Sequence, residues 1–119
     1  MEIKIVKDTI NKDELAEMAK EQFGDFVKAV VDIKKEIMAV GGELHADEEA
    51  LLMEKEGSES EYLWGINFYP EKSGEEWIEF NSMVNIKPTH GNPSRGIDSP
   101  EIREKILKIT RKLVDGVSS

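Results

Sequence analysis

The aromatic residues are concentrated in one segment, residues 62–88, and this constrains the fold more than any other feature. Both Trp, both Tyr and two of the four Phe lie within it. Aromatic side chains bury the largest area per residue, so the hydrophobic core is expected to form around this segment. Apolar runs at 62–70 and 77–88 flank a polar break at 71–76, which predicts a central β-hairpin.

Start and stop signals predict a helix on either side of this hairpin. Asn11 is a capping residue, and Gly24 follows an apolar helical spacing, which predicts a helix over residues 12–23. Ser99 is followed by a proline, which predicts a second helix over residues 100–115.

Three other segments complete the predicted order of elements. Residues 26–40 are rich in β-branched side chains with a charged break, which favours a hairpin over one helix across the same residues. Residues 47–56 fit either a helix, capped by Asp47 and ended by Gly57, or a strand paired with the central hairpin. Residues 1–6 alternate apolar and charged side chains, which predicts a short edge strand.

These elements predict one α+β domain over residues 1–119. A mainly antiparallel sheet of about four to five strands is expected, with the N-terminal and C-terminal helices packed on one face. Strand side chains alternate, so Trp64 and Phe68 are expected on one face and Leu63 on the other. Most of the core is expected to consist of Leu63, Trp64, Ile66, Phe68, Phe80, Val84, Ile86, Ile102, Ile106 and Ile109.

Charge and composition exclude several classes of partner. The formal net charge is -9 and the pI is about 4.8, which disfavours nucleic acids and anionic membranes, because both are bound through positive fields. Cysteine is absent, which excludes disulfides and thiolate-bound metals and favours a cytoplasmic location. No apolar run is long enough to span a bilayer. A protein or small-molecule partner is expected, with the chain acting as a monomer or homodimer.

The first candidate site is a divalent-metal site around His45 and Asp47. Glu43, His45, Asp47 and Glu49 alternate along the sequence, so an extended chain would place all four on one face. Imidazole and carboxylate groups are ligands for such cations. The other interpretation of these residues is a solvent-exposed strand followed by a helix cap.

The second candidate is an anion site in the loop before the C-terminal helix. This loop carries His90, Asn92, Ser94 and Arg95 among glycines, and Ser99 opens the helix. Backbone N–H groups of turns, the positive end of a helix and a planar guanidinium all bind phosphate or carboxylate. In such a site the histidine would serve as acid or base. The alternative is a surface loop whose side chains satisfy its own turns.

The third candidate is a polar series on the predicted central strands, Asn67, Asn81, Ser82 and Asn85. Asn is depleted in strands, so the series indicates either a polar face lining a cleft or a buried hydrogen-bonded network that fixes strand register. If the preceding loop folds back over this face, Asn67, Ser82 and Asn85 would orient a ligand bound at Arg95.

Four short motifs are spread over most of the chain: GGELHAD at residues 41–47, LWGIN at 63–67, SMVNIKP at 82–88, and the loop at 92–96. Together they resemble a small prokaryotic family of single-domain proteins that is catalogued only as a domain of unknown function. The resemblance implies one domain, and it brings no activity, cofactor or partner with it.

The sequence favours a small soluble domain that binds a partner, because no nucleophile paired with a base is visible. The alternative is an enzyme or small-molecule binder with an anion pocket around Arg95. A second alternative is the metal site around His45 and Asp47. No motif indicates a particular cofactor.

Overall fold

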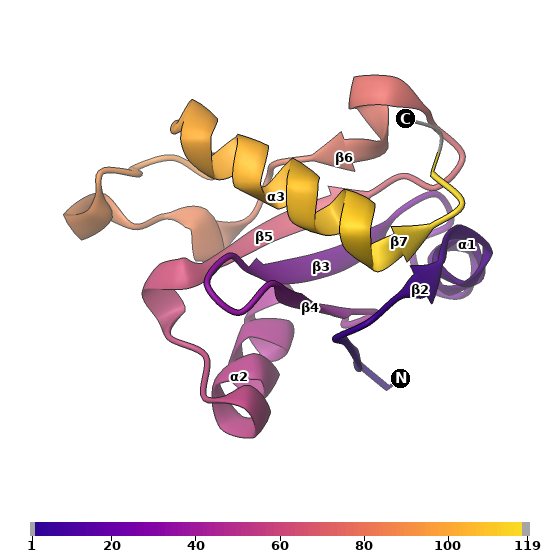
Figure 1. Ribbon diagram of the computed structural model, residues 1–119, viewed down its shortest axis with the longest axis horizontal. Coiled ribbons are helices and arrows are strands. Elements are labelled where there is room, and N and C mark those ends of the chain that lie inside the picture. The colour runs from indigo at the N-terminus through magenta and orange to yellow at the C-terminus, as the bar shows by residue number, and fades with distance from the viewer. Residues whose placement is uncertain (1, 118–119) are drawn as a thin grey trace.

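A five-stranded antiparallel sheet forms the centre of the protein, and helices cover both of its faces (Figure 1). The computed structural model describes residues 2–117. The predicted α+β class is confirmed, and β1 lies at the sheet edge, as its sequence predicts. The strands lie in the order β1 (Lys4–Val6), β4 (Ile37–Val40), β3 (Val27–Asp32), β5 (Leu63–Phe68) and β6 (Ile78–Glu79).

Residues 26–40 contain the β3–β4 hairpin, which their β-branched residues favour, and not a single helix. In the turn, Oδ1 of Asp32 accepts hydrogen bonds from the backbone N–H groups of Lys34 and Lys35, both at 2.9 Å. Glu36 then adopts a left-handed conformation with φ 57°. A buried aspartate that binds its own turn therefore ends β3 where the charged break begins.

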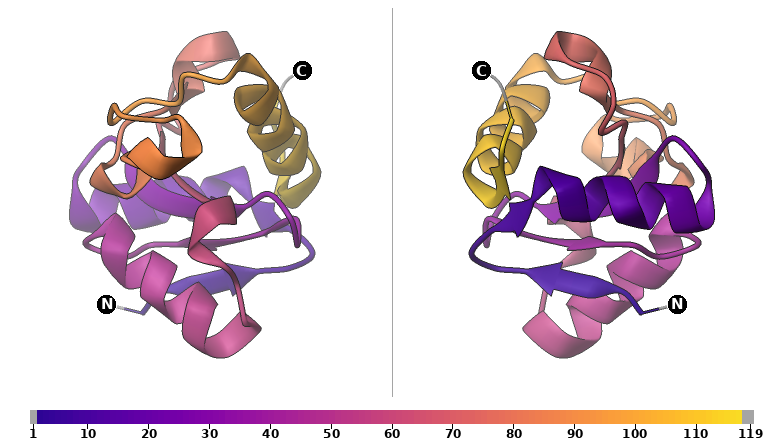
Figure 2. Two further views of the ribbon diagram at one scale, coloured as in Figure 1. Left: turned by 90° about the vertical axis from the view of Figure 1, so that its left-hand side faces the viewer. Right: turned by 90° about the vertical axis from the view of Figure 1, so that its right-hand side faces the viewer.

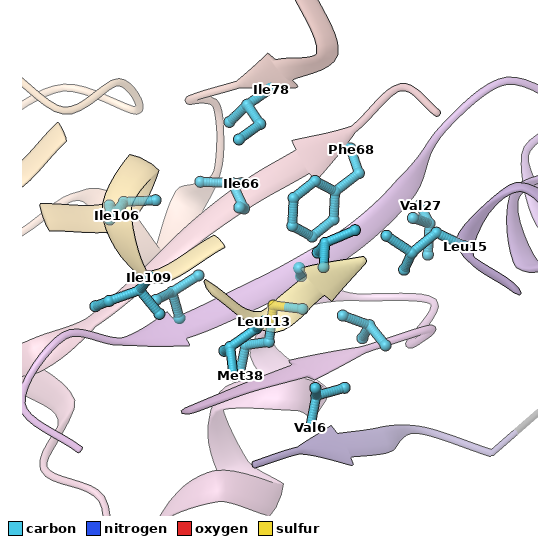
Figure 3. Close-up of a cluster of buried hydrophobic side chains, with 14 of the residues drawn as sticks. Val6, Leu15, Val27, Met38, Ile66, Phe68, Ile78, Ile106, Ile109 and Leu113 are labelled. Atoms are coloured by element: carbon cyan, nitrogen blue, oxygen red, sulfur yellow. The ribbon is translucent and has the colours of Figure 1, made fainter. Parts of the chain in front are cut away.

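Helices α1 (Lys12–Gln22) and α3 (Pro100–Leu113) pack on one face of the sheet, as predicted. Asn11 caps α1, because its side chain accepts a hydrogen bond from the Asp13 N–H at 2.7 Å. The apolar sides of both helices meet the sheet in the main core (Figure 3), where each fully buried large side chain contributes about 1.5–3 kcal/mol. The core residues labelled there are Val6, Leu15, Val27, Met38, Ile66, Phe68, Ile78, Ile106, Ile109 and Leu113.

The C-terminal helix is shorter than predicted and ends at Leu113. After it, β7 (Val114–Asp115) pairs in parallel with β2 (Ile10–Asn11), which joins the end of α3 to the start of α1. Within residues 2–117, none of the helices combines the length and apolar character needed to cross a membrane.

Helix α2 (His45–Glu56) covers the opposite face of the sheet and adds a third layer (Figure 2). Leu52 of α2 packs against Leu63 and against residues of β3 and β4 in a second core. Trp64 belongs to the main core, so the predicted alternation along β5 is confirmed. The segment left open between helix and strand is thus a helix, and Gly57 ends it at φ 67°.

The second strand of the central hairpin was predicted over residues 77–88, and this prediction is wrong beyond Glu79, where β6 (Ile78–Glu79) ends. The chain continues through two short 3-10 helices, η3 (Met83–Asn85) and η4 (Pro88–His90). Ser82 Oγ accepts a hydrogen bond from the Val84 N–H at 3.2 Å. Such local bonds compete with a strand ladder, and here they replace it.

The early end of β6 explains where the predicted core fails. The prediction that Ile86 belongs to the core is wrong, because this residue is 40% exposed. Phe80, Val84 and Ile102 are only partly buried, and the other predicted members are buried. The prediction also missed the large contribution of β3 and β4, which occupy the middle of the sheet.

Candidate functional site

Polar side chains gather at one end of the sheet, on the face that packs against α2. Lys28 on β3, Asn67 on β5 and Glu79 on β6 are register partners across three neighbouring strands. His45 in the first turn of α2 adjoins this row, as does Arg95 from the loop after β6. These five residues, Lys28, His45, Asn67, Glu79 and Arg95, form what we call the polar cluster.

His45 is buried, and the backbone of β5 holds its ring. Nε2 lies 2.8 Å from the carbonyl oxygen of Ile66. A carbonyl oxygen only accepts, so Nε2 carries the hydrogen and Nδ1 is the acceptor of the neutral ring. Burial is the main cause that lowers the pKa of His45, and the interactions of the ring with the Ile66 carbonyl and the Asn67 side chain oppose it. The charges of Lys28 and Arg95 lower this pKa further, so the ring is neutral at physiological pH.

Asn67 connects the cluster to β6 and carries an unpaired acceptor. Its Nδ2 donates to Oε1 of Glu79 at 2.8 Å, and the Tyr69 hydroxyl donates to the same oxygen at 3.3 Å. Oδ1 of Asn67 is buried, and it has no hydrogen-bond partner among residues 2–117. A buried acceptor without a donor is unfavourable, so a group that donates to this atom would gain a hydrogen bond.

The loop after β6 folds back along the end of the cluster. The Ser82 N–H donates to the carbonyl oxygen of Arg95 at 3.0 Å, and Asn85 Nδ2 donates to the same oxygen at 3.0 Å. The exposed Arg95 side chain then donates from Nε to Oδ1 of Asn81 at 3.0 Å. The fold-back on which the anion-site prediction depended is therefore present, and it brings the guanidinium beside β6.

Asn85 and Asn92 are buried and hold the backbone of this loop. Asn85 accepts from the Gly65 N–H at 2.7 Å and donates to the Gly65 carbonyl at 3.0 Å, as a neighbouring strand would. Asn92 donates to the Asn85 carbonyl at 2.7 Å and accepts from the Asp98 N–H at 2.8 Å. The hydrogen-bonded network thus accounts for these side chains, and a ligand role for Ser82, Asn85 and Asn92 stays a prediction.

Two other predicted loop residues have different surroundings. His90 is exposed in η4 and lines a separate hollow of about 390 Å³ with Lys87 and Glu49. Ser94 Oγ donates to Oδ1 of Asp98 at 3.2 Å. Of the predicted anion-site residues, the fold therefore brings Arg95 and Asn67 to one cluster and places His90 at another hollow.

The metal-site hypothesis requires an extended chain over residues 43–49, but α2 begins at His45. Strong helix formers follow in the sequence, and they favour the helix over the strand. Asp47 is exposed inside the first turn of α2, so it does not cap the helix as predicted and shares no strand face with His45. Within residues 2–117, no three His, Asp or Glu side chains are grouped to hold a metal ion.

Glu48 is a buried acid that the sequence analysis did not single out. Its Oε2 accepts a hydrogen bond from the Gly42 N–H at 2.9 Å. A Cβ atom on Gly42 would lie 2.8 Å from Cγ of Glu48, so this close approach requires glycine. Burial raises the pKa of Glu48 well above its ordinary value, against the Gly42 hydrogen bond and the charge of Lys28. The glycine pair before the helix is the sequence signal that could have indicated this contact.

A larger hollow of about 740 Å³ lies between α3 and residues 74–80, where Figure 1 shows α3 alongside β6. Sequence reasoning missed it, because the hollow depends on how two segments far apart in the chain meet. Its apolar lining includes Trp77, Ile78, Phe80 and Leu107, and its charged lining consists of Glu75, Arg103, Glu104 and Arg111.

One family model matches the chain over most of its length. It is described as "Protein of unknown function (DUF5674)" and covers residues 4–113. The chain belongs to this family. The match includes the whole polar cluster and the full length of α1, α2 and α3, which confirms the resemblance seen in the sequence motifs. No curated protein and no solved structure matches the chain significantly.

Proposed function

We propose that the protein is a small binding domain, and that the polar cluster binds an organic ligand through its carboxylate or phosphate group. The observation that carries this proposal is the fold-back of the loop, which brings Arg95 to the cluster. A guanidinium offers a planar fork of donors that matches carboxylate and phosphate oxygens.

The balance of charge in the cluster supports an anionic ligand. Lys28 and Arg95 are cationic and both act on His45, which is itself neutral. Glu79 is the one acidic member, and its Oε1 already accepts from Asn67 and from the Tyr69 hydroxyl. The two cations of the cluster outnumber its single acid in a chain of net charge -9, which favours an anionic ligand at this place.

An aromatic surface beside the cluster favours a ligand whose remaining part, beyond the anionic group, is planar and apolar. Phe23 and Phe26 stack with ring centroids 4.7 Å apart, and Tyr69 lies 5.5 Å from Phe26. The ammonium group of Lys28 sits 5.0 Å from the centroid of the Phe23 ring, which orients this cation. Phe23 is 39% exposed, so a planar apolar group can pack on it while the anionic group meets the cations.

The same features favour binding over catalysis. His45 is the titratable group at the centre of the cluster, and the Ile66 carbonyl occupies its Nε2. Its lowered pKa makes the protonated form scarce at neutral pH, which suits a fixed neutral ring better than a general acid.

We place this binding domain in the cytoplasm, as a monomer or a homodimer formed through the edge strand β1, and light scattering distinguishes the two states.

A thermal-shift screen with phosphates, nucleotides, carboxylates and divalent metals tests the proposal. A ligand at ten times its Kd adds about 1.4 kcal/mol of stability, which raises Tm by roughly 5 °C. Phenyl phosphate and benzoate combine the expected anion and ring. We expect a shift with such compounds that disappears in Arg95→Ala and weakens in Lys28→Ala.

The matched control is Arg111→Ala, which removes an exposed arginine of α3 outside the cluster. This variant should keep the full shift. A flat response to every anion, or a shift that Arg95→Ala leaves unchanged, would refute the proposal. A shift with divalent metals alone, lost in His45→Ala, would favour the metal interpretation instead.

A further inference from the structure

The hollow between α3 and residues 74–80 is a groove on the face of the sheet opposite the polar cluster. Ile78 lines the groove, and the next residue, Glu79, belongs to the cluster, so strand alternation separates the two surfaces. The groove is therefore a second surface, and it does not depend on the function proposed for the cluster.

The main core is not fully closed at this groove. Phe80, Leu107 and Val117 pack against the core but remain partly buried. On α3, residues 103, 107 and 111 follow one another at helical spacing and turn the same side toward the groove. The volume of about 740 Å³ falls in the range of small-molecule sites, which is roughly 300–1,000 Å³.

Arg103 is a pre-positioned donor in this groove. Its NH1 donates to the Ile97 carbonyl at 2.7 Å, and the side chain is half-buried. The four ion pairs between residues 2–117 all use lysine, so neither Arg103 nor Arg111 forms one there. An anchored guanidinium has further N–H donors in a fixed plane, which is the geometry that a carboxylate binds.

The distribution of charge along the groove selects the class of ligand. Glu75, Glu104 and Arg111 are exposed, whereas Arg103 is half-buried, so the innermost charge is positive. The two acidic and two basic side chains balance, and the exposed acids repel a polyanion. A ligand with one carboxylate on an apolar body can pair with the inner cation, and its single negative charge is repelled less than a polyanion is.

We infer that this groove binds an amphipathic monocarboxylate, whose carboxylate pairs with Arg103 and whose apolar body packs on Phe80 and Leu107.

Trp77 lines the groove, and Trp64 lies elsewhere in the sheet, under the ammonium group of Lys87. The chain has two tryptophans, so their two indole N–H signals in a ¹⁵N–¹H NMR spectrum distinguish the groove from the buried site of Trp64.

The test is a titration of the ¹⁵N-labelled full chain with sodium octanoate, with Trp77→Phe used to assign the indole signals. We expect a saturable shift of the Trp77 signal and a much smaller one for Trp64. Octan-1-ol keeps the chain length but lacks the charge, so it should bind at least about tenfold more weakly.

Two variants remove the two parts of the proposed site. Arg103→Gln should weaken octanoate binding by about tenfold or more, because a charge-assisted hydrogen bond is lost. Leu107→Glu adds a repulsive charge to the apolar lining and should abolish binding, which keeps the test decisive if the first variant fails to fold. Lys108→Gln removes an exposed cation of the same helix outside the groove lining, so it is the matched control and should bind octanoate as the unaltered chain does.

Four results would overturn the inference. One is the absence of a saturable shift at Trp77, and another is equal affinity for octanoate and octan-1-ol. The third is unchanged octanoate affinity in the folded groove variants. The fourth is a loss of octanoate binding in Lys108→Gln equal to that in Arg103→Gln, because a general effect of net charge would then explain both.

Discussion

Strands β3–β5 and the segment 80–98 lie side by side, but different interactions hold them. In the strands, alternate side chains enter two cores while the backbone groups pair in ladders. In segment 80–98, the side chains of Ser82, Asn85 and Asn92 bind the backbone directly. The difference teaches that short polar side chains can take the place of a strand where apolar alternation alone predicts one.

The largest expected effect comes from truncating a side chain of the ladder region. Phe68→Ala should lower the free energy of unfolding by about 3–5 kcal/mol, because Phe68 is fully buried and stacks on Trp77 at 4.8 Å. The matched control is Ile86→Ala in the second region, where 40% exposure predicts a change of about 0.5 kcal/mol or less. Urea denaturation measures both, and equal losses would remove the distinction between the regions.

The second prediction removes the side chain that acts as a strand. Asn85→Ala leaves the N–H and carbonyl of Gly65 without their partner, so we expect a loss on the order of 2–3 kcal/mol. Amide exchange at Gly65 should become faster as well. Asn81→Ala, at an exposed position, should cost about 0.5 kcal/mol or less. A stable Asn85→Ala with unchanged Gly65 exchange would show that water replaces this contact without cost.

The third prediction concerns the contact between the two regions. A Cβ atom on Gly65 would lie 2.5 Å from Cβ of Ser82, so Gly65→Ala should destabilise the protein by about 1–3 kcal/mol. Adding Ser82→Gly should restore part of this loss, and the double-mutant cycle measures the coupling. Additive effects would mean that the two residues do not touch in solution.

The effect that is smallest at acid pH and grows with pH tests a third backbone contact, that of Glu48 with Gly42. Because the folded-state pKa of Glu48 is raised, its contribution to stability is full below the unfolded pKa of 4.5 and is lost as pH rises through the folded value. Glu48→Gln keeps an acceptor for the Gly42 N–H and does not ionise. The variant should gain stability relative to the unaltered chain by up to about 1.4 kcal/mol per pH unit above 4.5, until the folded pKa is reached.

Denaturation curves between pH 4 and pH 9 measure this difference. We expect it to be smallest at acid pH and to grow toward alkaline pH. A difference that stays constant over the whole range would contradict a raised pKa in the folded state. Glu49→Gln offers a comparison on the same helix, because Glu49 is only partly buried and should show a weaker dependence.

The sequence predicted those parts of the fold in which local signals and burial agree. Asn11 and Ser99 begin their helices as expected, and the alternation of Leu63 and Trp64 placed β5 correctly between two cores. The prediction failed after Glu79, because apolar residues continue at alternate positions while neighbouring polar groups bind the backbone. The periodicity of apolar residues predicts strands, but it does not show which backbone group a Ser or Asn side chain will hydrogen-bond.

The candidate site was predictable in its residue types and not in its arrangement. Arg95 and Asn67 were expected to serve one anion site if the loop folded back, whereas His45 was assigned to a separate metal site. Only the fold-back of the loop and the early start of α2 bring them together. Glu48 stayed hidden, because its burial depends on the close approach that Gly42 permits.

The most direct test of the central claim follows the guanidinium of Arg95 while phenyl phosphate is added to the ¹⁵N-labelled chain. The sequence contains three arginines, so three Nε–H signals are expected in the spectrum, and Arg95→Ala assigns the relevant one. We predict a saturable shift of the Arg95 signal together with the Asn67 side-chain amide, and little change at Arg103 and Arg111. If the Arg95 and Asn67 signals remain in place at saturating ligand, or if all three arginines shift linearly without saturation, the polar cluster is not an anion-binding site.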